Sequence, residues 1–308
     1  VASMRVGMLT SGGDCQSLNA TMRGVAKSLY KMYDDVEIIG FEDGYKGLMY
    51  ADYQIMKPSD FSGILTKGGT ILGTSRQPFK LMRVPDENGL DKVEAMKHTY
   101  KKLKLECLVV LGGNGSQKTA NLLREEGLNV VSLPKTIDND LWGTDVTFGF
   151  QSAINVATNA IDCIHTTAAS HGRVFIVEVM GHKVGWLTLY AGLAGGADII
   201  LLPEIPYDLN VIVGALRERN RQGKRVTVPG HTQRGGEPCP YDRVLSTRLG
   251  AAAAKLIQDK EYGYMVAVHN NEITKVPLAE VAGRLKTVDP NSSIIKEAKM
   301  LGISFGDE

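Results

Sequence analysis

The sequence has few of the features that mark metal-binding, secreted or membrane proteins. It contains only four cysteines, Cys15, Cys107, Cys163 and Cys239, and no pair of them has the C-x-x-C spacing. This argues against a zinc site built on cysteine and against a disulfide framework. No apolar run approaches the roughly 20 residues that a membrane helix needs, and we find no signal-peptide profile. We therefore expect a cytoplasmic protein with no membrane partner.

The sequence also lacks an excess of charge of one sign. The formal net charge is +1 and 22% of the residues are charged, so the dense positive field of nucleic-acid-binding proteins is missing. The chain has 308 residues, 43% of them hydrophobic, which is enough for a buried core but more than one core usually serves. We expect two domains that act on small molecules, and no nucleic-acid partner.

Short apolar runs, each followed by a glycine and then by a helical pattern, recur along the chain. This alternation is typical of parallel strands that lead into helices through short loops, and it indicates an α/β fold. The run 174–179 predicts a strand that is buried on both faces. Expected strands are 4–9, 36–40, 108–111, 129–133, 174–179, 198–202 and 226–228; expected helices are 18–30, 117–126, 151–164, 186–194, 211–220 and 245–257, with more amphipathic helices between 273 and 301.

Two glycine-rich loops, 10–14 and 112–116, each follow an expected strand and precede an expected helix. Their glycines would let backbone N–H groups approach a phosphate at a helix N-terminus. We expect Ser116 and Lys118 to cap the second helix and to meet negative charge. The spacings match neither the P-loop nor the dinucleotide fingerprint, and ordinary tight turns explain two such loops about as well as phosphate binding does.

A third loop, 136–140, places Asp138 and Asp140 two residues apart after a strand. One carboxylate could accept a proton from a sugar hydroxyl while the other holds a metal ion. Phosphoryl transfer also needs positive charge on the moving group, from Mg²⁺ or arginine, and Arg76 is a candidate. Turn stabilisation or helix capping is the alternative interpretation of the two aspartates.

With these loops and its other motifs considered together, the chain resembles the phosphofructokinase family over nearly its whole length, and the motifs occur in the same order. The segments that carry the resemblance are 10–19, 68–70, 73–76, 112–116, 134–140, 180–182 and 230–236. Within the family it is most similar to the bacterial branch that mixes ATP-dependent and pyrophosphate-dependent members. The resemblance implies a phosphofructokinase fold, with two Rossmann-like three-layer lobes and mainly parallel sheets. A larger donor-binding lobe would comprise 1–149 and 233–287, and a smaller fructose-6-phosphate-binding lobe 150–232 and 288–308.

The activity implied by the resemblance is transfer of the γ-phosphoryl group of ATP to the 1-hydroxyl of fructose 6-phosphate in glycolysis, with Mg²⁺ as cofactor. Asp138 would be the base, with Thr136 and Arg76 also catalytic. Family members are homo-oligomers, typically tetramers, in which Arg173 and Arg225 would reach a neighbouring subunit's site. Planar guanidinium groups suit such phosphate contacts.

Further binding roles follow from the resemblance alone. The donor would contact Gly12, Arg76, Asn114, Gly115, Ser116 and Lys135, and the metal ion Asn114 and Asp140. The sugar phosphate would contact Thr136, Ile137, Asp138, Arg173, Met180, Gly181, His182, Arg225, His231, Thr232, Gln233 and Arg234.

Two positions bear on the phosphoryl donor. Gly115 resembles the ATP-dependent type, because the pyrophosphate-dependent type tends to carry an aspartate there that fills the space of the α-phosphate. Lys135 resembles the pyrophosphate-dependent type, although the mixed branch carries this lysine and still uses ATP. We expect ATP as the donor, and pyrophosphate-dependent fructose-6-phosphate 1-phosphotransferase is the alternative.

The sequence departs from the family pattern at several places, among them Gln16 and Ser17, which replace a Pro-Gly pair common in the first loop. Asn114 stands where the family usually has an acidic residue that helps to bind Mg²⁺, and an amide is a weaker ligand for a hard cation. Between Asn220 and Arg225, tens of residues that the family carries are missing. Either the chain has an internal deletion or the sequence omits a segment, and we favour the second. These departures motivate an alternative of another class, a catalytically weak sugar-phosphate-binding regulatory homologue.

Overall fold

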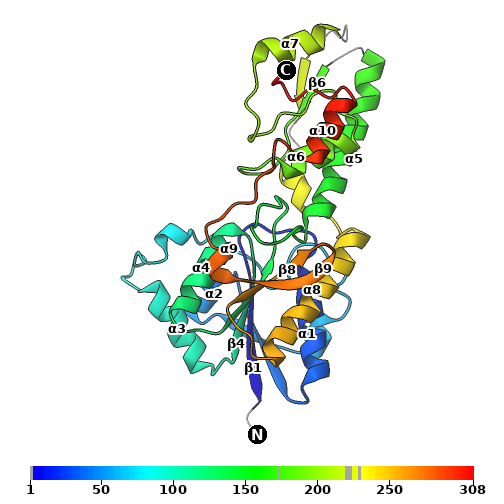
Figure 1. Ribbon diagram of the computed structural model, residues 1–308. Coiled ribbons are helices and arrows are strands. Elements are labelled where there is room, and N and C mark those ends of the chain that lie inside the picture. The colour runs from blue at the N-terminus through cyan, green and yellow to red at the C-terminus, as the bar shows by residue number, and fades with distance from the viewer. Residues whose placement is uncertain (1–2, 172–173, 219–223, 228–229) are drawn as a thin grey trace. The chain divides into compact units, whose positions relative to one another are not determined.

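The computed structural model describes residues 3–171, 174–218, 224–227 and 230–308, and in it the chain forms two compact units (Figure 1). Unit 1 comprises Val1–Thr136, Leu141–Gly149 and Gly235–Leu285. Unit 2 comprises Ile137–Asp140, Phe150–Arg234 and Lys286–Glu308. The chain therefore passes between the units several times, and in the sequence short segments of one unit alternate with segments of the other.

Unit 1 is built on a seven-stranded sheet with the order β3-β2-β1-β4-β5-β8-β9. The five inner strands are parallel and the edge strands β3 and β9 are antiparallel to their neighbours. The inner strands are almost completely buried, as expected for a parallel sheet that helices cover on both faces. The strands are Met4–Ser11 (β1), Val36–Phe41 (β2), Tyr53–Met56 (β3), Cys107–Gly112 (β4), Val130–Pro134 (β5), Tyr264–His269 (β8) and Glu272–Pro277 (β9).

Helices cover this sheet on two sides, with α1 and α8 on one side and α2, α3 and α4 on the other (Figure 1). From β1 the chain moves through α1 to β2, whereas from β4 it moves through α4 to β5 in the opposite direction. Right-handed crossovers in opposite directions place their helices on opposite faces. The helices are Leu18–Met32 (α1), Tyr45–Tyr50 (α2), Lys92–Lys102 (α3), Asn114–Glu125 (α4), Pro240–Gln258 (α8) and Leu278–Val281 (α9), with short 3₁₀ turns at Pro58–Phe61 (η1) and Phe79–Leu81 (η2).

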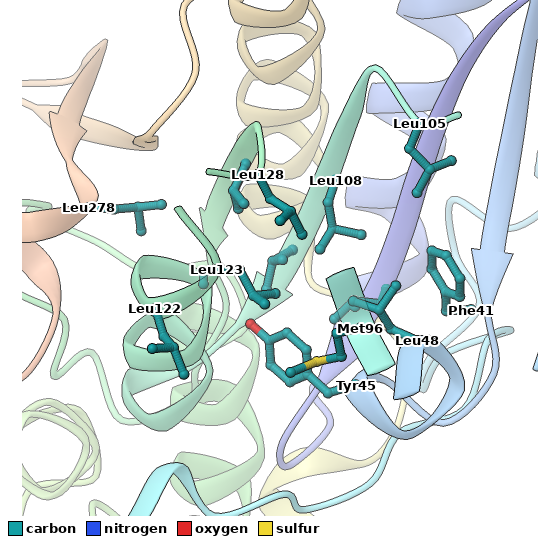
Figure 2. Packing of buried hydrophobic residues seen from close by; sticks show 14 of the residues in the cluster. Phe41, Tyr45, Leu48, Met96, Leu105, Leu108, Leu122, Leu123, Leu128 and Leu278 are labelled. Carbon is teal, nitrogen blue, oxygen red and sulfur yellow. The ribbon is translucent and has the colours of Figure 1, made fainter. Parts of the chain in front are cut away.

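Figure 2 shows the core between the sheet and α2, α3 and α4, where the ring of Tyr45 lies near Met96, Leu48 and Leu123. Tyr45 is only 1% exposed, and burial raises the pKa of its hydroxyl well above the ordinary value. The hydroxyl donates a 2.7 Å hydrogen bond to the carbonyl of Ser116. This bond satisfies the one polar atom of the buried side chain and ties the core to the first turn of α4.

Unit 2 is smaller and its sheet has two parallel strands, β6 and β7. A second core lies between α6, α10 and the segments around them, and it includes Leu189, Ile200, Val288, Ile295 and Phe305. The elements of unit 2 are Phe150–His171 (α5), Val174–Val177 (β6), Trp186–Ala194 (α6), Leu209–Glu218 (α7), Lys224–Thr227 (β7), Gly230–Arg234 (η3) and Ser293–Met300 (α10).

The sequence patterns gave wrong predictions at three places. The strand predicted at 174–179 ends at Val177 and is not buried on both faces, since Ile176 is 53% exposed in the two-stranded sheet. The predicted strand 198–202 is irregular and forms only a bridge between Ile199 and Ser304. Ile200 and Leu202 are buried because they pack in the second core, which needs no strand pairing, whereas Leu201 is exposed.

The third error lies in the segment 273–301, where only amphipathic helices, interrupted at Pro290, were predicted. Its first residues form β9, paired with β8 through a two-residue turn at Asn270 and Asn271. Both asparagines have positive φ, 50° and 65°, as type I′ hairpin turns require and asparagine tolerates. Helices follow only at α9 and α10. No helix within the described ranges is long and apolar enough to cross a membrane.

The contact between α1 and α8 depends on two glycines. A methyl group on Gly250 would lie 2.7 Å from the backbone nitrogen of Val25 and 2.8 Å from the carbonyl carbon of Gly24. Backbone atoms cannot rotate away as a side chain can, so the two helices would have to separate. Close packing of α1, α8 and the sheet leaves no room for that separation.

We predict that Gly250→Ala lowers the free energy of unfolding by about 1–3 kcal/mol, the usual cost of overpacking. Gly214→Ala in α7 is the matched control, because a methyl group there meets nothing within 4 Å. The control should be neutral or slightly stabilising, since alanine favours a helix over glycine by roughly 1 kcal/mol. Urea unfolding followed by circular dichroism measures both variants, and equal stability of Gly250→Ala and the parent would contradict the packing account.

Candidate active site

The carboxyl ends of β1 and β4 lie side by side in unit 1, where the chain turns in opposite directions from the two strands. Ligands of open α/β sheets bind at such a switch point, beyond the carboxyl ends of the strands. Both glycine-rich loops predicted from the sequence begin there, the first after Ser11 and the second after Gly112. Strand β5, which pairs with β4, ends next to them and leads into Lys135 and Thr136.

Gly12 is held by the segment 73–76 and lies close to two polar side chains. Its carbonyl accepts a 2.6 Å hydrogen bond from Oγ1 of Thr74, and its N–H donates to the carbonyl of Ser75 at 3.2 Å. Its φ of +85° favours glycine, and a methyl group there would lie 3.5 Å from Nζ of Lys135 and 3.6 Å from Oγ of Ser116. The first loop, Lys135 and Ser116 therefore come together, as the sequence led us to expect.

Ser116 lies in the first turn of α4 and does not cap the helix. Its Oγ donates a 2.8 Å hydrogen bond to Oγ of Ser11, and a methyl group on Gly112 would lie only 2.2 Å from its Cβ. The N-cap is Gly113, which has no side chain to offer. The prediction that Ser116 caps α4 is therefore wrong, and the first-turn N–H groups keep their capacity to bind an anion.

Two residues of the same turn face different surroundings. A side chain on Gly115 would meet nothing within 4 Å, so the space beside this glycine is open. Oδ1 of Asn114 is buried and has no hydrogen-bond partner among the residues that the structure describes. A buried acceptor left without a donor costs about 1–3 kcal/mol, and a hard cation would satisfy such an oxygen.

Lys135 is 3% exposed, and its ammonium group donates to the carbonyl of Gly13. This contact joins the first loop to the residue that follows β5. The nearby thiol of Cys15 is fully buried, and burial raises its pKa to about 11 although Lys135 opposes the shift. Cys15 therefore stays protonated and serves as a packing residue.

Arg76 is exposed and forms no hydrogen bond or ion pair with the part of the chain that the structure describes. The backbone that carries it is nevertheless fixed, because Thr10 Oγ1 donates to the carbonyl of Gly73 at 2.7 Å and Ser75 Oγ donates to that of Asp43 at 2.6 Å. Its guanidinium group thus extends from an ordered segment of unit 1 that also binds Gly12.

The predicted base belongs to unit 2, in the four-residue segment 137–140 that follows Thr136 and precedes Leu141 of unit 1. Thr136 is buried, and its carbonyl accepts a 2.8 Å bond from Oγ1 of Thr147. Ile137 is fully buried, Asp138 is partly exposed and Asp140 is 4% exposed. Asp138 is thus the more exposed residue of the two, although its Oδ1 is buried.

Unit 2 also carries the segment 180–182 and the residues that end η3. Gln233 is fully buried, and its Oε1 accepts a 3.1 Å hydrogen bond from the N–H of Met180. A methyl group on Gly181 would lie 2.5 Å from the carbonyl of Val184, and His182 is exposed with a left-handed φ of 57°. The structure thus joins two segments predicted to bind the sugar phosphate.

The remaining predicted residues differ in what the structure describes of them. Thr232 is exposed and Arg234 is partly buried, both in η3. Arg173 lies outside the described residues. The side chains of Arg225 and His231 are outside them as well, although both residues belong to described backbone elements.

Sequence reasoning missed three residues that organise these loops. Gln117 is fully buried, and its amide donates to the carbonyl of Gly112, the last residue of β4, and to that of Leu133, the last but one of β5. Lys286 donates to Oδ1 of Asn139 at 3.1 Å. Glu204 accepts from the N–H of Gly185 at 2.8 Å. A buried polar residue directly after a glycine loop could have revealed Gln117, whereas no local pattern points to the other two.

A metal ion at this site would need ligands from several sources. Among the described residues, no three histidine, cysteine, aspartate or glutamate side chains lie close enough to hold a metal ion by themselves. The buried oxygen of Asn114 fits one ligand position for a hard cation. Oxygen atoms of a bound phosphoryl donor would have to complete the shell.

Comparisons with known proteins give a consistent result. The sequence profile described as Phosphofructokinase matches residues 5–226 and 215–257. A Spirochaeta thermophila protein named ATP-dependent 6-phosphofructokinase is 50% identical over 365 residues, which cover 99% of this chain and 98% of the relative. A Bacteroides thetaiotaomicron protein named ATP-dependent 6-phosphofructokinase 3 is 44% identical over 339 residues, covering 98% of this chain and 100% of the relative.

Among solved structures, Pichia pastoris phosphofructokinase in the T-state matches with a TM-score of 0.82 and 30% identity. The match covers 91% of this chain and 35% of the yeast chain, and it confirms the predicted phosphofructokinase fold.

The comparisons also bear on the apparent gap between Asn220 and Arg225. The alignment with the Spirochaeta protein runs over 365 residues, whereas this chain has 308, so the relative has residues without a counterpart here. The two profile matches meet and overlap at residues 215–226, which is where the sequence pattern placed the gap. With the profile and both relatives extending over nearly the whole sequence, the chain belongs to the phosphofructokinase family.

Proposed function

We propose that this chain is an ATP-dependent 6-phosphofructokinase, which transfers the γ-phosphoryl group of ATP to the 1-hydroxyl of D-fructose 6-phosphate to give fructose 1,6-bisphosphate. The observation that carries the proposal is the meeting of Gly12, Ser116 and Lys135 at the switch point of the large sheet. Two full-length relatives named ATP-dependent 6-phosphofructokinase support the same donor. The four scattered cysteines do not suggest a disulfide framework, which supports a cytoplasmic location for this step of glycolysis.

On the donor side, we assign phosphate binding to unit 1. The first-turn N–H groups of α4 and the backbone of Gly12 offer donors to phosphate oxygens. Lys135 brings a buried positive charge to the same loop. Arg76 would stabilise the charge that accumulates on the moving phosphoryl group.

Mg²⁺ is the metal ion that we assign to the donor side, with Asn114 and Asp140 among its ligands. When bound, the ion would neutralise the charge that develops on the phosphate oxygens. The Asn114 amide is a weaker ligand than a carboxylate, so we expect saturation at a higher Mg²⁺ concentration than a carboxylate at position 114 would give.

On the acceptor side, we assign the substrate to unit 2. Asp138 would take the proton of the 1-hydroxyl, because a sugar hydroxyl is too weakly acidic to attack phosphorus unaided. Thr136 and Ile137 would line the sugar site. The segment 180–182 and residues 231–234 would bind the sugar phosphate, and their connection through Gln233 supports one common site in unit 2.

We further propose that the active enzyme is a homotetramer with shared sites. In it, Arg173 and Arg225 would each reach the 6-phosphate bound by a neighbouring subunit, where guanidinium groups form bidentate bonds to phosphate. This part of the proposal rests on the family resemblance alone.

Asp138→Asn tests the role of the base. The amide keeps the shape of the side chain but cannot accept the proton, so kcat should fall by about 10²–10⁴-fold while fructose 6-phosphate still binds. A coupled assay of ADP formation and a separate measurement of substrate binding give the two quantities. Asp162→Asn on the exposed face of α5 is the control and should leave kcat unchanged. Near-normal turnover of Asp138→Asn would exclude the assignment.

Gly115→Asp tests the choice of ATP over pyrophosphate. The first side-chain carbon at position 115 would meet nothing within 4 Å, and a carboxylate in the first turn stabilises a helix by about 0.3–1 kcal/mol. The variant should therefore fold at least as stably, while kcat/KM with ATP falls more than about tenfold, or about 1.4 kcal/mol.

The control for this experiment is Gly115→Asn, which has the same size without the charge. A loss with both variants would assign the effect to occupied space, and a loss with aspartate alone would assign it to charge. Unchanged kcat/KM with ATP in both variants would contradict our placement of the nucleotide beside Gly115.

A further inference from the structure

Lys286 lies beside the segment 137–140 and contacts it at two points. Its ammonium group donates a 3.1 Å hydrogen bond to Oδ1 of Asn139. Its backbone N–H donates a 2.9 Å bond to the carbonyl of Asp140. These are the two residues that directly follow Asp138, so Lys286 fixes both the side chain and the backbone on the carboxyl side of the proposed base.

Asn139 has an unusual backbone conformation for a residue with a side chain. Its φ is +54°, a left-handed conformation that asparagine tolerates better than most residues but that still costs energy. Asn139 is 4% exposed, so its amide oxygen depends on protein donors. The hydrogen bond from Lys286 meets this need and holds the turn that sets the direction of the Asp138 side chain.

Lys286 is itself held from the other side. The indole N–H of Trp186 donates a 2.9 Å bond to the carbonyl of Lys286, and the ammonium group lies 5.4 Å from the centre of the Trp186 ring. Two residues further on, the N–H of Val288 donates to Oε1 of Glu204 at 3.1 Å, and the same oxygen accepts from Gly185. Lys286 is thus anchored to the start of α6 by backbone and side-chain contacts.

Gly185 follows the segment 180–182 by only three residues. The contacts through Glu204 therefore connect the segment 286–288 with the loop that carries His182. Within unit 2, the segment 137–140 and this loop are both hydrogen-bonded to the segment 286–288 or to Glu204 beside it, and Lys286 makes the contacts with 137–140.

We propose that Lys286 is a positioning residue for the reaction, which holds Asp138 in the direction needed to take the proton of the 1-hydroxyl. This inference rests on the proposed function, because it requires Asp138 to be the base. A displacement of about 1 Å between reacting groups costs on the order of 10²-fold in rate. The loss of Lys286 should therefore reduce catalysis far more than substrate binding.

Lys286→Met removes the donors and keeps the length of the side chain. We expect kcat to fall about 10–10²-fold, with the dissociation constant of fructose 6-phosphate changed less than about threefold. Lys286→Arg keeps a cation with N–H donors and should restore part of kcat. Lys299→Met is the matched control in unit 2, since Lys299 pairs only with Asp307 and Glu308 among the described residues, and its kcat should equal that of the parent.

Asn139→Gly tests the route of the effect, because glycine accepts the left-handed backbone but lacks the amide oxygen. This variant should also lower kcat. The kcat of the double variant Lys286→Met with Asn139→Gly should lie no more than about twofold below that of the poorer single variant, because both substitutions remove the same hydrogen bond between the two side chains. Asn139→Gly alone decides the matter if Lys286→Met fails to fold.

Parent-like kcat in Lys286→Met, or losses that multiply in the double variant, would overturn the positioning role. So would a rise in the dissociation constant of fructose 6-phosphate that matches the whole loss of kcat/KM. An inactive parent enzyme with every donor would instead refute the proposed function, which keeps the two failures distinguishable.

Discussion

The packing of the first turn of α4 against the end of β1 is the contact on which the donor side of unit 1 depends. Gly112 leaves room for Ser116, whose hydroxyl donates a hydrogen bond to Ser11. The hydroxyl of the core residue Tyr45 donates a hydrogen bond to the carbonyl of Ser116. Because α4 is fixed at these points, its N-terminal N–H groups face the first glycine loop in a constant arrangement. Under the proposed function, phosphate binding at this place would need little reorganisation, and the preorganised donors would favour charge stabilisation during transfer.

The acceptor side is organised differently, by contacts between segments that are far apart in the sequence. The residues 137–140 are joined to Lys286, and the loop before α6 is joined to the same region through Glu204. In unit 1, where the chain continues from residue 140 and precedes residue 286, Leu141 pairs with Leu285, and Arg284 lies 4.2 Å from the centre of the Trp142 ring. The carboxyl end of the base segment is therefore bound to the chain that passes it in the opposite direction.

Local patterns were enough to predict the elements that carry the donor loops. Four inner strands of the large sheet, β1, β2, β4 and β5, were recognised from short apolar runs, and β1, β4 and β5 were found to within two residues at each end, whereas the inner strand β8 was not predicted. The family motifs added the proposed roles of Asp138 and Arg76, which no pattern of hydrophobicity indicates and which stay predictions. The β8–β9 hairpin was missed although its Asn270-Asn271 turn is a recognisable signal.

Other features could not have been predicted from local sequence. The exposure of Ile176 follows from the number of strands that pair with β6, and the irregular segment at 198–202 follows from packing against α10 and its neighbours. Lys286 and Asn139 are 147 positions apart, and each looks like an ordinary polar residue in its own segment. Only the tertiary fold brings them together.

The most direct test of the account follows the phosphorus atoms in a mixture of the parent protein, fructose 6-phosphate and Mg²⁺ with either ATP or pyrophosphate. In the presence of ATP, ³¹P NMR should show loss of the γ-phosphate signal and the matching appearance of a 1-phosphate ester and ADP. With pyrophosphate, the rate should be far lower. Turnover with pyrophosphate alone would contradict ATP as the donor, and binding of fructose 6-phosphate without turnover with either donor would contradict the proposed catalysis.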